Sequence, residues 1–252
     1  MGPRTVESDA HRKTQAIIVA RAKAWGCELE EDSFTAQTPN GSKAMKNLIM
    51  KRRGTSDKLV VLSGHYDTKV LPGFTGANDG GSSTGLLLEL ARVICRSSGK
   101  NDVWMVWLDG EEAFRQWSDA DSLYGSRRLA ARWAADGTAK RTIALINVDM
   151  IGDQDLRLMY EWNSTAGLRN LVWQTAGELG FSKHFSTQAG AIEDDHIPFL
   201  RAGIPSLDLI DFDFGPNNSY WHTEKDTVDK LSAESFQVVG EVLLRVLTKL
   251  EN

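Results

Sequence analysis

Four short apolar runs recur along the chain, and stretches with helical periodicity separate them. The apolar runs lie at residues 59–62, 103–108, 143–148 and 207–210, and helices are expected at 83–95, 122–135, 168–179 and 232–250. Apolar strands that alternate with helices are typical of a mostly parallel sheet covered on both faces. We therefore predict an α/β fold with a central twisted, mixed but mostly parallel sheet of about six strands and helices on both faces.

The N-terminal part of the chain has its own pattern. A first helix is expected after Ser8, a good N-cap residue, and it should end at Gly26. Residues 47–51 and 58–63 then predict two strands joined as a hairpin by the turn-forming residues 53–57. No repeat or linker divides the sequence, so we expect residues 1–252 to form a single domain.

Composition excludes several classes of protein. The 29 Lys and Arg residues are interspersed with 34 Asp and Glu residues, and the net charge of −5 argues against a nucleic-acid partner. The apolar runs are much shorter than the roughly 20 residues that a membrane-spanning helix needs. The first 13 residues are polar and lack the apolar segment of a signal peptide.

The two cysteines, Cys27 and Cys95, are too few for a disulfide framework. Their neighbours in the sequence are apolar or aromatic. We expect both to be small core residues without a chemical role.

Polar residues follow three of the apolar runs directly. His65 and Asp67 come after the first run, Glu111 and Glu112 after the second, and Asp149 ends the third. Ligands of open α/β sheets bind beyond the carboxyl ends of the strands. These polar side chains are therefore expected to converge on one site.

Five residues in such positions or in nearby loops could bind a metal ion. They are His65, Asp79, Glu112, Asp149 and His222. A mixture of imidazole nitrogen and carboxylate oxygen suits zinc, which keeps an open position in catalytic sites. Zinc is therefore the predicted ion.

The pair Glu111-Glu112 suggests two different roles. Side chains of successive residues diverge, so the two carboxylates are not expected to bind the same ion. The one that does not bind it is well placed to act as a general base or acid. Asp67 could orient His65 by accepting a hydrogen bond from its ring.

Several motifs together resemble a known superfamily. GHYD, GANDGGSSTG, LDGEEAF, INVDMIG and YWHT follow the order found in the M28-type zinc aminopeptidases. Three stretches resemble the glutaminyl-peptide cyclotransferases, or glutaminyl cyclases, more closely. These are residues 109–126 with Trp117, residues 193–200 and residues 221–223.

The resemblance implies a zinc-aminopeptidase-like fold and assigns roles to individual residues. One zinc ion would be bound by Asp79, Glu112 and His222. Glu111 would be the proton shuttle, and Asp194 and Asp149 would complete the catalytic set. The residues expected to bind the substrate are Trp117, Trp221, Glu193 and Asp208.

Two features depart from the animal enzymes. Asp208 stands where many animal cyclases have a histidine, and the change affects the expected hydrogen bonds of the pocket. Gly64 precedes His65, so the disulfide that the animal enzymes form near the site has no counterpart. A compact, bacterial type of cyclase is expected.

The resemblance implies zinc-dependent cyclisation of N-terminal glutaminyl residues to pyroglutamate with release of ammonia. Its partners would be peptides or proteins with N-terminal Gln, and the enzyme is expected to be a monomer in a secreted or periplasmic location. The alternative is a two-zinc M28-type aminopeptidase, with His65 and Asp149 completing a second site and Asp79 bridging the ions. A peptide-binding module without catalysis would lack the base or a ligand, and the sequence has both.

Overall fold

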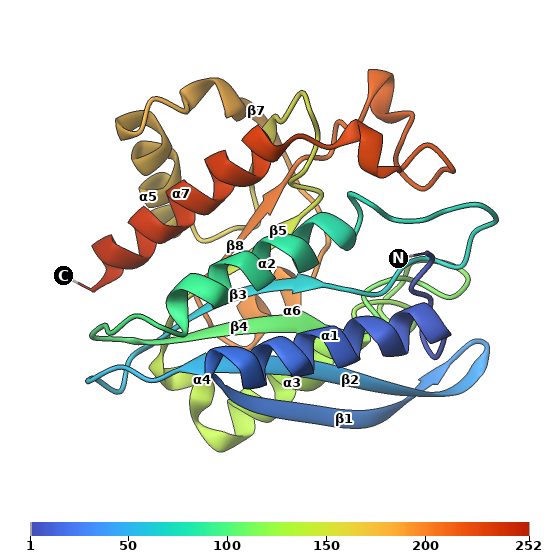
Figure 1. Cartoon of the computed structure of the whole chain (residues 1–252), viewed down its shortest axis with the longest axis horizontal. Coiled ribbons are helices and arrows are strands. Elements are labelled where there is room, and N and C mark those ends of the chain that lie inside the picture. Colours follow the sequence, from blue (N-terminus) through green and yellow to red (C-terminus); the bar gives the residue numbers. More distant parts are fainter. Residues whose placement is uncertain (1, 252) are drawn as a thin grey trace.

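The computed structural model describes residues 2–251 and contains a central six-stranded sheet with helices on both faces (Figure 1). The strand order in this sheet is β1-β2-β4-β3-β5-β8. The strands are β1 (Glu28–Thr38), β2 (Gly41–Arg52), β3 (Leu59–His65), β4 (Asp102–Leu108), β5 (Thr142–Asp149) and β8 (Ser206–Ile210). Strands β4, β3, β5 and β8 are parallel, whereas β2 is antiparallel to both β1 and β4. The predicted mixed, mostly parallel sheet is confirmed.

The helices divide into two layers because each face of the sheet is apolar. Side chains from α1 (Asp9–Trp25), α2 (Gly81–Ile94), α5 (Ala166–Glu178) and α7 (Ala233–Leu250) pack in one core cluster. The other cluster includes side chains from α3 (Tyr124–Asp136), α4 (Thr138–Arg141) and α6 (His196–Arg201). A small separate sheet of β6 (Leu158–Glu161) and β7 (Phe185–Gly190) lies outside the main one. Three short 3₁₀ turns complete the fold at Ser182–His184, Pro216–Asn218 and Val228–Lys230.

Local sequence explains where the first and last helices begin. The Ser8 side chain accepts a hydrogen bond from the backbone N–H of His11, and Gly26 ends α1 in the left-handed conformation with φ of 73°. The Ser232 side chain caps α7 by accepting a hydrogen bond from the backbone N–H of Glu234. The predicted first helix is confirmed at both ends.

The predicted hairpin between residues 47–51 and 58–63 is wrong. Strand β2 forms a hairpin with β1, and its other edge pairs with β4. Strand β3 pairs instead with β4 and β5. Strand β1 was missed because it lies at the edge of the sheet and buries only Asp32 and Ala36, so its sequence has no strong apolar alternation.

Cys27 and Cys95 pack against the main core cluster, as expected, but the expectation that they have no chemical role is wrong, because they form a disulfide. Cys27 follows α1 and Cys95 ends α2, and these two helices pack against each other. Their Cα atoms lie 5.4 Å apart although 68 residues separate them in the sequence. The pairing depends on tertiary packing and has no local signal.

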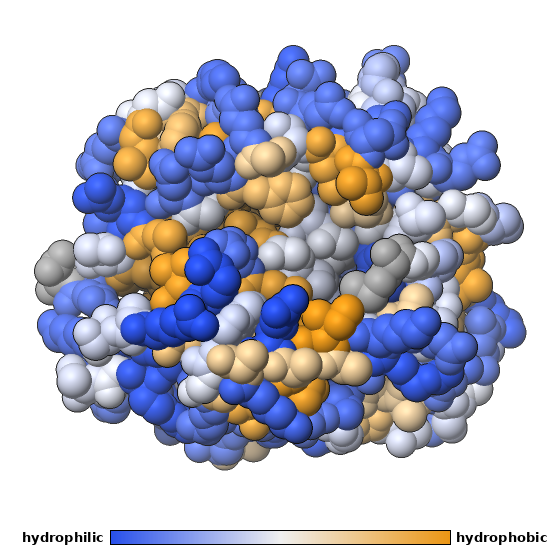
Figure 2. All heavy atoms as spheres, viewed as in Figure 1, coloured by the Kyte–Doolittle hydropathy of each residue, from blue (hydrophilic) through white to orange (hydrophobic). Residues whose placement is uncertain are grey.

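The exterior agrees with the mixed charge of the sequence. Figure 2 shows a face on which hydrophilic side chains predominate and hydrophobic ones form small patches. Among the helices of residues 2–251, none has the length and apolar character required to cross a membrane.

Loss of the disulfide should destabilise the fold. We expect a Cys27→Ser/Cys95→Ser variant to lose about 2–4 kcal/mol of unfolding free energy, because the unfolded chain is no longer constrained. Urea unfolding followed by circular dichroism measures the difference. A reductant should lower the wild-type midpoint to that of the variant and leave the variant unchanged. An unfolding midpoint of the wild type that does not respond to reductant would contradict the prediction.

Candidate active site

A cavity of about 560 Å³ lies beyond the carboxyl ends of the parallel strands. This edge is where α/β sheets bind ligands. Acidic, aromatic and apolar side chains from separate loops line it. They include Asp79, Glu111, Glu112, Trp117, Asp149, Glu193, Asp194, Trp221 and His222, together with Lys69, Arg115, Gln116, Ile192, Ile210 and Phe212.

One buried carboxylate, Asp67, holds the beginning of the loop after β4. Asp67 is buried, and its two oxygens accept hydrogen bonds from the backbone N–H groups of Gly110, Glu111 and Glu112 at 3.0, 3.1 and 3.3 Å. The contact expected between Asp67 and His65 is a longer one, with Nδ1 of the ring 3.6 Å from the carboxylate. Asp67 therefore fixes the direction in which both glutamates leave the backbone.

One group of side chains in the cavity has donor atoms close enough to hold a metal ion. It consists of Asp79, Glu112 and His222, and their ligand atoms lie within 4.8 Å of one another. Nε2 of His222 is 3.0 Å from Oε1 of Glu112 and 3.2 Å from Oδ2 of Asp79. Glu111 lies in the same cavity but outside this group, as expected for diverging neighbours.

A second such group shares Asp79 with the first. It consists of His65, Asp79 and Asp149. Nε2 of His65 is 3.2 Å from Oδ1 of Asp79 and 3.2 Å from Oδ1 of Asp149. His65 is only 1% exposed and does not line the cavity, so it lies beneath the first group.

The charges of the first group stabilise one another. Burial would lower the pKa of His222, but its hydrogen bonds to Asp79 and Glu112 raise that pKa to about 9. Burial would raise the pKa of Asp79, but hydrogen bonds from His222 and His65 hold it below its usual range. A histidine that ligates a metal is neutral, so metal binding here would release a proton.

Two other carboxyl groups in the cavity, Glu111 and Asp149, have raised pKa values. Burial raises the pKa of Glu111 well above its usual range, and the nearby charges of Glu112, Asp194 and Asp195 add to the effect while His65 opposes it. Burial also raises the pKa of Asp149 to about 7 against the influence of His65. A carboxyl that gains and loses a proton near neutral pH suits general acid–base chemistry.

Aromatic side chains form the walls of the cavity. The Trp221 ring stacks on His222 with centroids 4.1 Å apart and packs against Phe212 at 4.9 Å. Trp117 donates a hydrogen bond of 3.4 Å from Nε1 to Glu193. An apolar wall beside a set of polar groups is typical of a site that binds a small or extended ligand.

Asp208 is the one residue expected to bind the substrate that does not line the cavity. It is the third of five residues in β8 and is fully buried. Its carboxylate accepts a hydrogen bond of 3.1 Å from Asn147, and Asn147 also donates to Asp194 at 3.1 Å. Asp208 is therefore linked to the cavity residue Asp194 by their shared hydrogen-bond donor Asn147. Asp208 itself is not exposed to a substrate.

Sequence reasoning missed Lys69 and Phe212. Nζ of Lys69 lies 3.1 Å from Oε2 of Glu112, so a cation neighbours the proposed ligand. Lys69 lies two residues after the GHYD motif, and Phe212 lies two residues after the predicted apolar run 207–210. Their positions just beyond a strand are the signal that could have found them.

Comparisons with known proteins agree with this geometry. The sequence profile of peptidase family M28 matches residues 47–247. The Bos taurus protein named glutaminyl-peptide cyclotransferase is 34% identical, over 85% of this chain and 69% of its own length. The crystal structure of Acidobacteriales bacterium glutaminyl cyclase matches this chain with 41% sequence identity and a TM-score of 0.95. The match covers 99% of this chain and 89% of the Acidobacteriales chain.

The chain belongs to peptidase family M28 and, within it, to the glutaminyl cyclases. The fold is also shared with a Zn-dependent exopeptidase from Parabacteroides distasonis, with 26% identity and a TM-score of 0.85 over 98% of this chain and 92% of that chain. The two activities therefore use the same scaffold, and only the details of the site can separate them.

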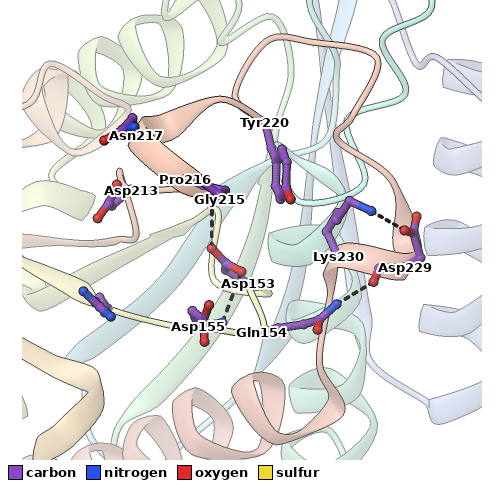
Figure 3. A pocket seen from close by; sticks show the side chains of 11 residues that line it. Asp153, Gln154, Asp155, Asp213, Gly215, Pro216, Asn217, Tyr220, Asp229 and Lys230 are labelled. Carbon is purple, nitrogen blue, oxygen red and sulfur yellow. Dashed lines mark hydrogen bonds and ion pairs between the residues drawn. The ribbon is translucent and has the colours of Figure 1, made fainter.

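A second cavity, of about 500 Å³, is lined by residues that include Asp153, Gly215, Tyr220 and Lys230 (Figure 3). Its aspartates are partly engaged, because the Asp153 carboxylate accepts from the N–H groups of Asp155 and Gly215 and Lys230 pairs with Asp229. Neither group of metal-capable residues found in the described part of the chain belongs to it. The first cavity is therefore the candidate active site.

The role of Asp67 can be tested with an isosteric change. Asp67→Asn should lower kcat/KM by roughly tenfold or more, because an amide nitrogen then faces buried N–H donors at a cost of about 1–3 kcal/mol. The matched control is Asp102→Asn. The Asp102 carboxylate accepts a hydrogen bond from the Gly54 N–H at the amino end of β4, away from the cavity. The control should lose stability without losing kcat/KM. Equal kcat/KM losses in both variants would refute a specific role of Asp67.

Proposed function

We propose that this enzyme cyclises N-terminal glutaminyl residues of peptides and proteins to pyroglutamate, releasing ammonia, with one zinc ion bound by Asp79, Glu112 and His222. The observation that carries the proposal is the position of Glu111 beside that ligand group, in a cavity walled by Trp117 and Trp221. The names of the bovine relative and of the Acidobacteriales structure support the same reaction.

The donor set fits a catalytic zinc ion. Two carboxylates and one imidazole supply three protein ligands, which is the number that leaves a position open for a substrate. When bound, zinc would act as a Lewis acid that polarises the γ-carbonyl of the substrate glutamine. Asp79 and Glu112 are both buried, and a bound cation would offset their negative charges.

The chain's own residues supply the remaining chemistry. The α-amine and the side-chain amide belong to one residue, so the protein needs only to hold them in a reactive geometry and to move a proton. Glu111 would accept a proton from the attacking amine and return it to the departing nitrogen. The raised pKa of Glu111, caused by burial and neighbouring acids, suits a group that must hold and release a proton. Asp149 and Asp194 lie in the same cavity and are proposed to share this proton with Glu111.

A two-zinc aminopeptidase is the alternative. The second group, His65 with Asp79 and Asp149, and the likeness to the Zn-dependent exopeptidase favour it. We prefer the one-ion cyclase because the bovine relative and the Acidobacteriales structure carry that name, and because Trp117 and Glu193 from the cyclase-like stretches line the cavity. With one ion bound, Nε2 of His65 would be free to hold Asp79 by a hydrogen bond.

The location and assembly of the enzyme are also proposals. The disulfide between Cys27 and Cys95 suits an oxidising compartment, which supports a secreted or periplasmic location. A monomer is proposed because one chain supplies all the residues of the site.

The proposed reaction can be tested with two substrates and one variant. The purified protein should convert a Gln-initiated peptide to pyroglutamyl peptide, detected by mass spectrometry and ammonia release, and it should not release N-terminal leucine. A chelator should abolish the activity and zinc should restore it. Glu111→Gln should lower kcat by about 10²–10⁴-fold while the protein stays folded. Release of leucine without formation of pyroglutamate would favour the aminopeptidase instead.

The pH dependence follows from the nucleophile. An α-amine has a pKa of roughly 7.7–8.0 and attacks only when neutral, so kcat/KM should rise as the pH increases through this range. Initial rates at low substrate concentration from about pH 6 to 9 give the profile. A profile that is flat across this range would contradict rate-limiting attack by the free amine.

A further inference from the structure

Arg4 is a buried cation in the segment before α1, and its side chain reaches the site from the N-terminal end of the chain. It is 5% exposed. Its guanidinium donates hydrogen bonds to the backbone carbonyls of Tyr66 at 2.9 Å, Thr75 at 3.1 Å, Gly76 at 2.7 Å and Asp79 at 3.2 Å. One side chain therefore binds four carbonyls of a single loop.

That loop, residues 66–80, contains no helix or strand. It nevertheless carries Asp67, Lys69 and the proposed ligand Asp79. Buried backbone carbonyls need donors, and here no sheet or helix provides them. The backbone N–H of Arg4 also donates to Oγ1 of Thr68 at 2.8 Å, so main chain and side chain of Arg4 both attach to the loop.

The opposite side of the loop is held by a carboxylate. Asp226 accepts from the N–H groups of Asn78 at 2.7 Å and Asp79 at 3.1 Å. Gly76 has φ of 58°, and a Cβ there would lie 2.6 Å from the carbonyl oxygen of Asp79 and 3.2 Å from the Arg4 guanidinium. Asp79 is thus fixed between Arg4 and Asp226, and the backbone at Gly76 is packed too closely to accept a side chain.

We propose that Arg4 is a positioning residue that sets the metal affinity of the site by fixing the backbone of Asp79. The inference rests on the proposed metal site. A lysine cannot replace the guanidinium, because its single ammonium group lacks the planar fork that reaches several carbonyls at once. Outer contacts of this kind commonly change metal affinity by about 10–100-fold.

The chain offers a matched control in Arg52. It is 8% exposed and donates to the carbonyl of Asn101 at 2.7 Å. Arg52 pairs with Val103 at the start of β4, whereas Glu112 lies beyond the end of that strand. Loss of this guanidinium should affect stability at the amino end of β4 and leave the proposed zinc ligands undisturbed.

The test is a direct measurement of zinc binding by Arg4→Lys, Arg52→Lys and the wild type. Chelator competition gives the zinc Kd, and urea unfolding of the metal-free proteins gives their stability. We expect Arg4→Lys to raise the zinc Kd by about 10–100-fold, and Arg52→Lys to leave it within about twofold. At saturating zinc, Arg4→Lys should recover most of its kcat. A zinc Kd of Arg4→Lys within about twofold of the wild type would overturn the inference.

A milder variant covers the case in which Arg4→Lys does not fold. Thr68→Val keeps the shape of the side chain and removes the acceptor of the Arg4 N–H. It should raise the zinc Kd in the same direction by a smaller factor, and an unchanged Kd would count against the inference. If the wild type itself binds no zinc, the proposed metal site fails and this inference fails with it. Tight binding by the wild type and by both variants would overturn only the role of Arg4.

Discussion

The structure depends on placing several carboxylates together at the carboxyl ends of parallel strands. Asp79, Glu112 and Asp149 are each at most 8% exposed, and isolated buried charges of this kind would be strongly unfavourable. The nearby cations His65 and His222 compensate them in part. The acidic groups at the cavity still outnumber their cationic partners, and this imbalance is the physical basis for expecting a divalent cation.

The same groups are positioned largely by hydrogen bonds to loop backbone. Asp67 accepts three N–H groups of the loop after β4, and Asp226 accepts two from the loop before α2. Arg4 donates to the carbonyls of the latter loop. Catalytic groups on loops need such support, because loops have no regular hydrogen-bond ladder of their own. The buried polar residues around the cavity therefore act as a frame for the few side chains that would meet a substrate.

Much of the fold could be predicted from the sequence because buried parallel strands are apolar throughout. Residues 59–62, 103–108 and 143–148 all lie in central strands, and the polar residues after them line or underlie the cavity. Strand β1 could not be found in this way, because an edge strand with many charged residues lacks the apolar signal. The Cys27–Cys95 bond was missed for a different reason, since it depends on how two helices pack.

The site shows the same division between local and tertiary information. The proposed ligands follow strands or lie in recognisable motifs, so the sequence indicates them. Asp208 lies within β8, and its position in the middle of a buried strand keeps it away from the cavity. Arg4 has no motif around it that indicates a role, and only the folded chain brings it to the Asp79 loop.

Anomalous diffraction at the zinc edge, from crystals of the zinc-loaded enzyme, tests the central claim most directly because it counts and locates the ions. The account predicts one ion in contact with Asp79, Glu112 and His222, with His65 bound only to its neighbouring carboxylates. Two ions that share Asp79, the second in contact with His65 and Asp149, would contradict it and would indicate a two-metal peptidase.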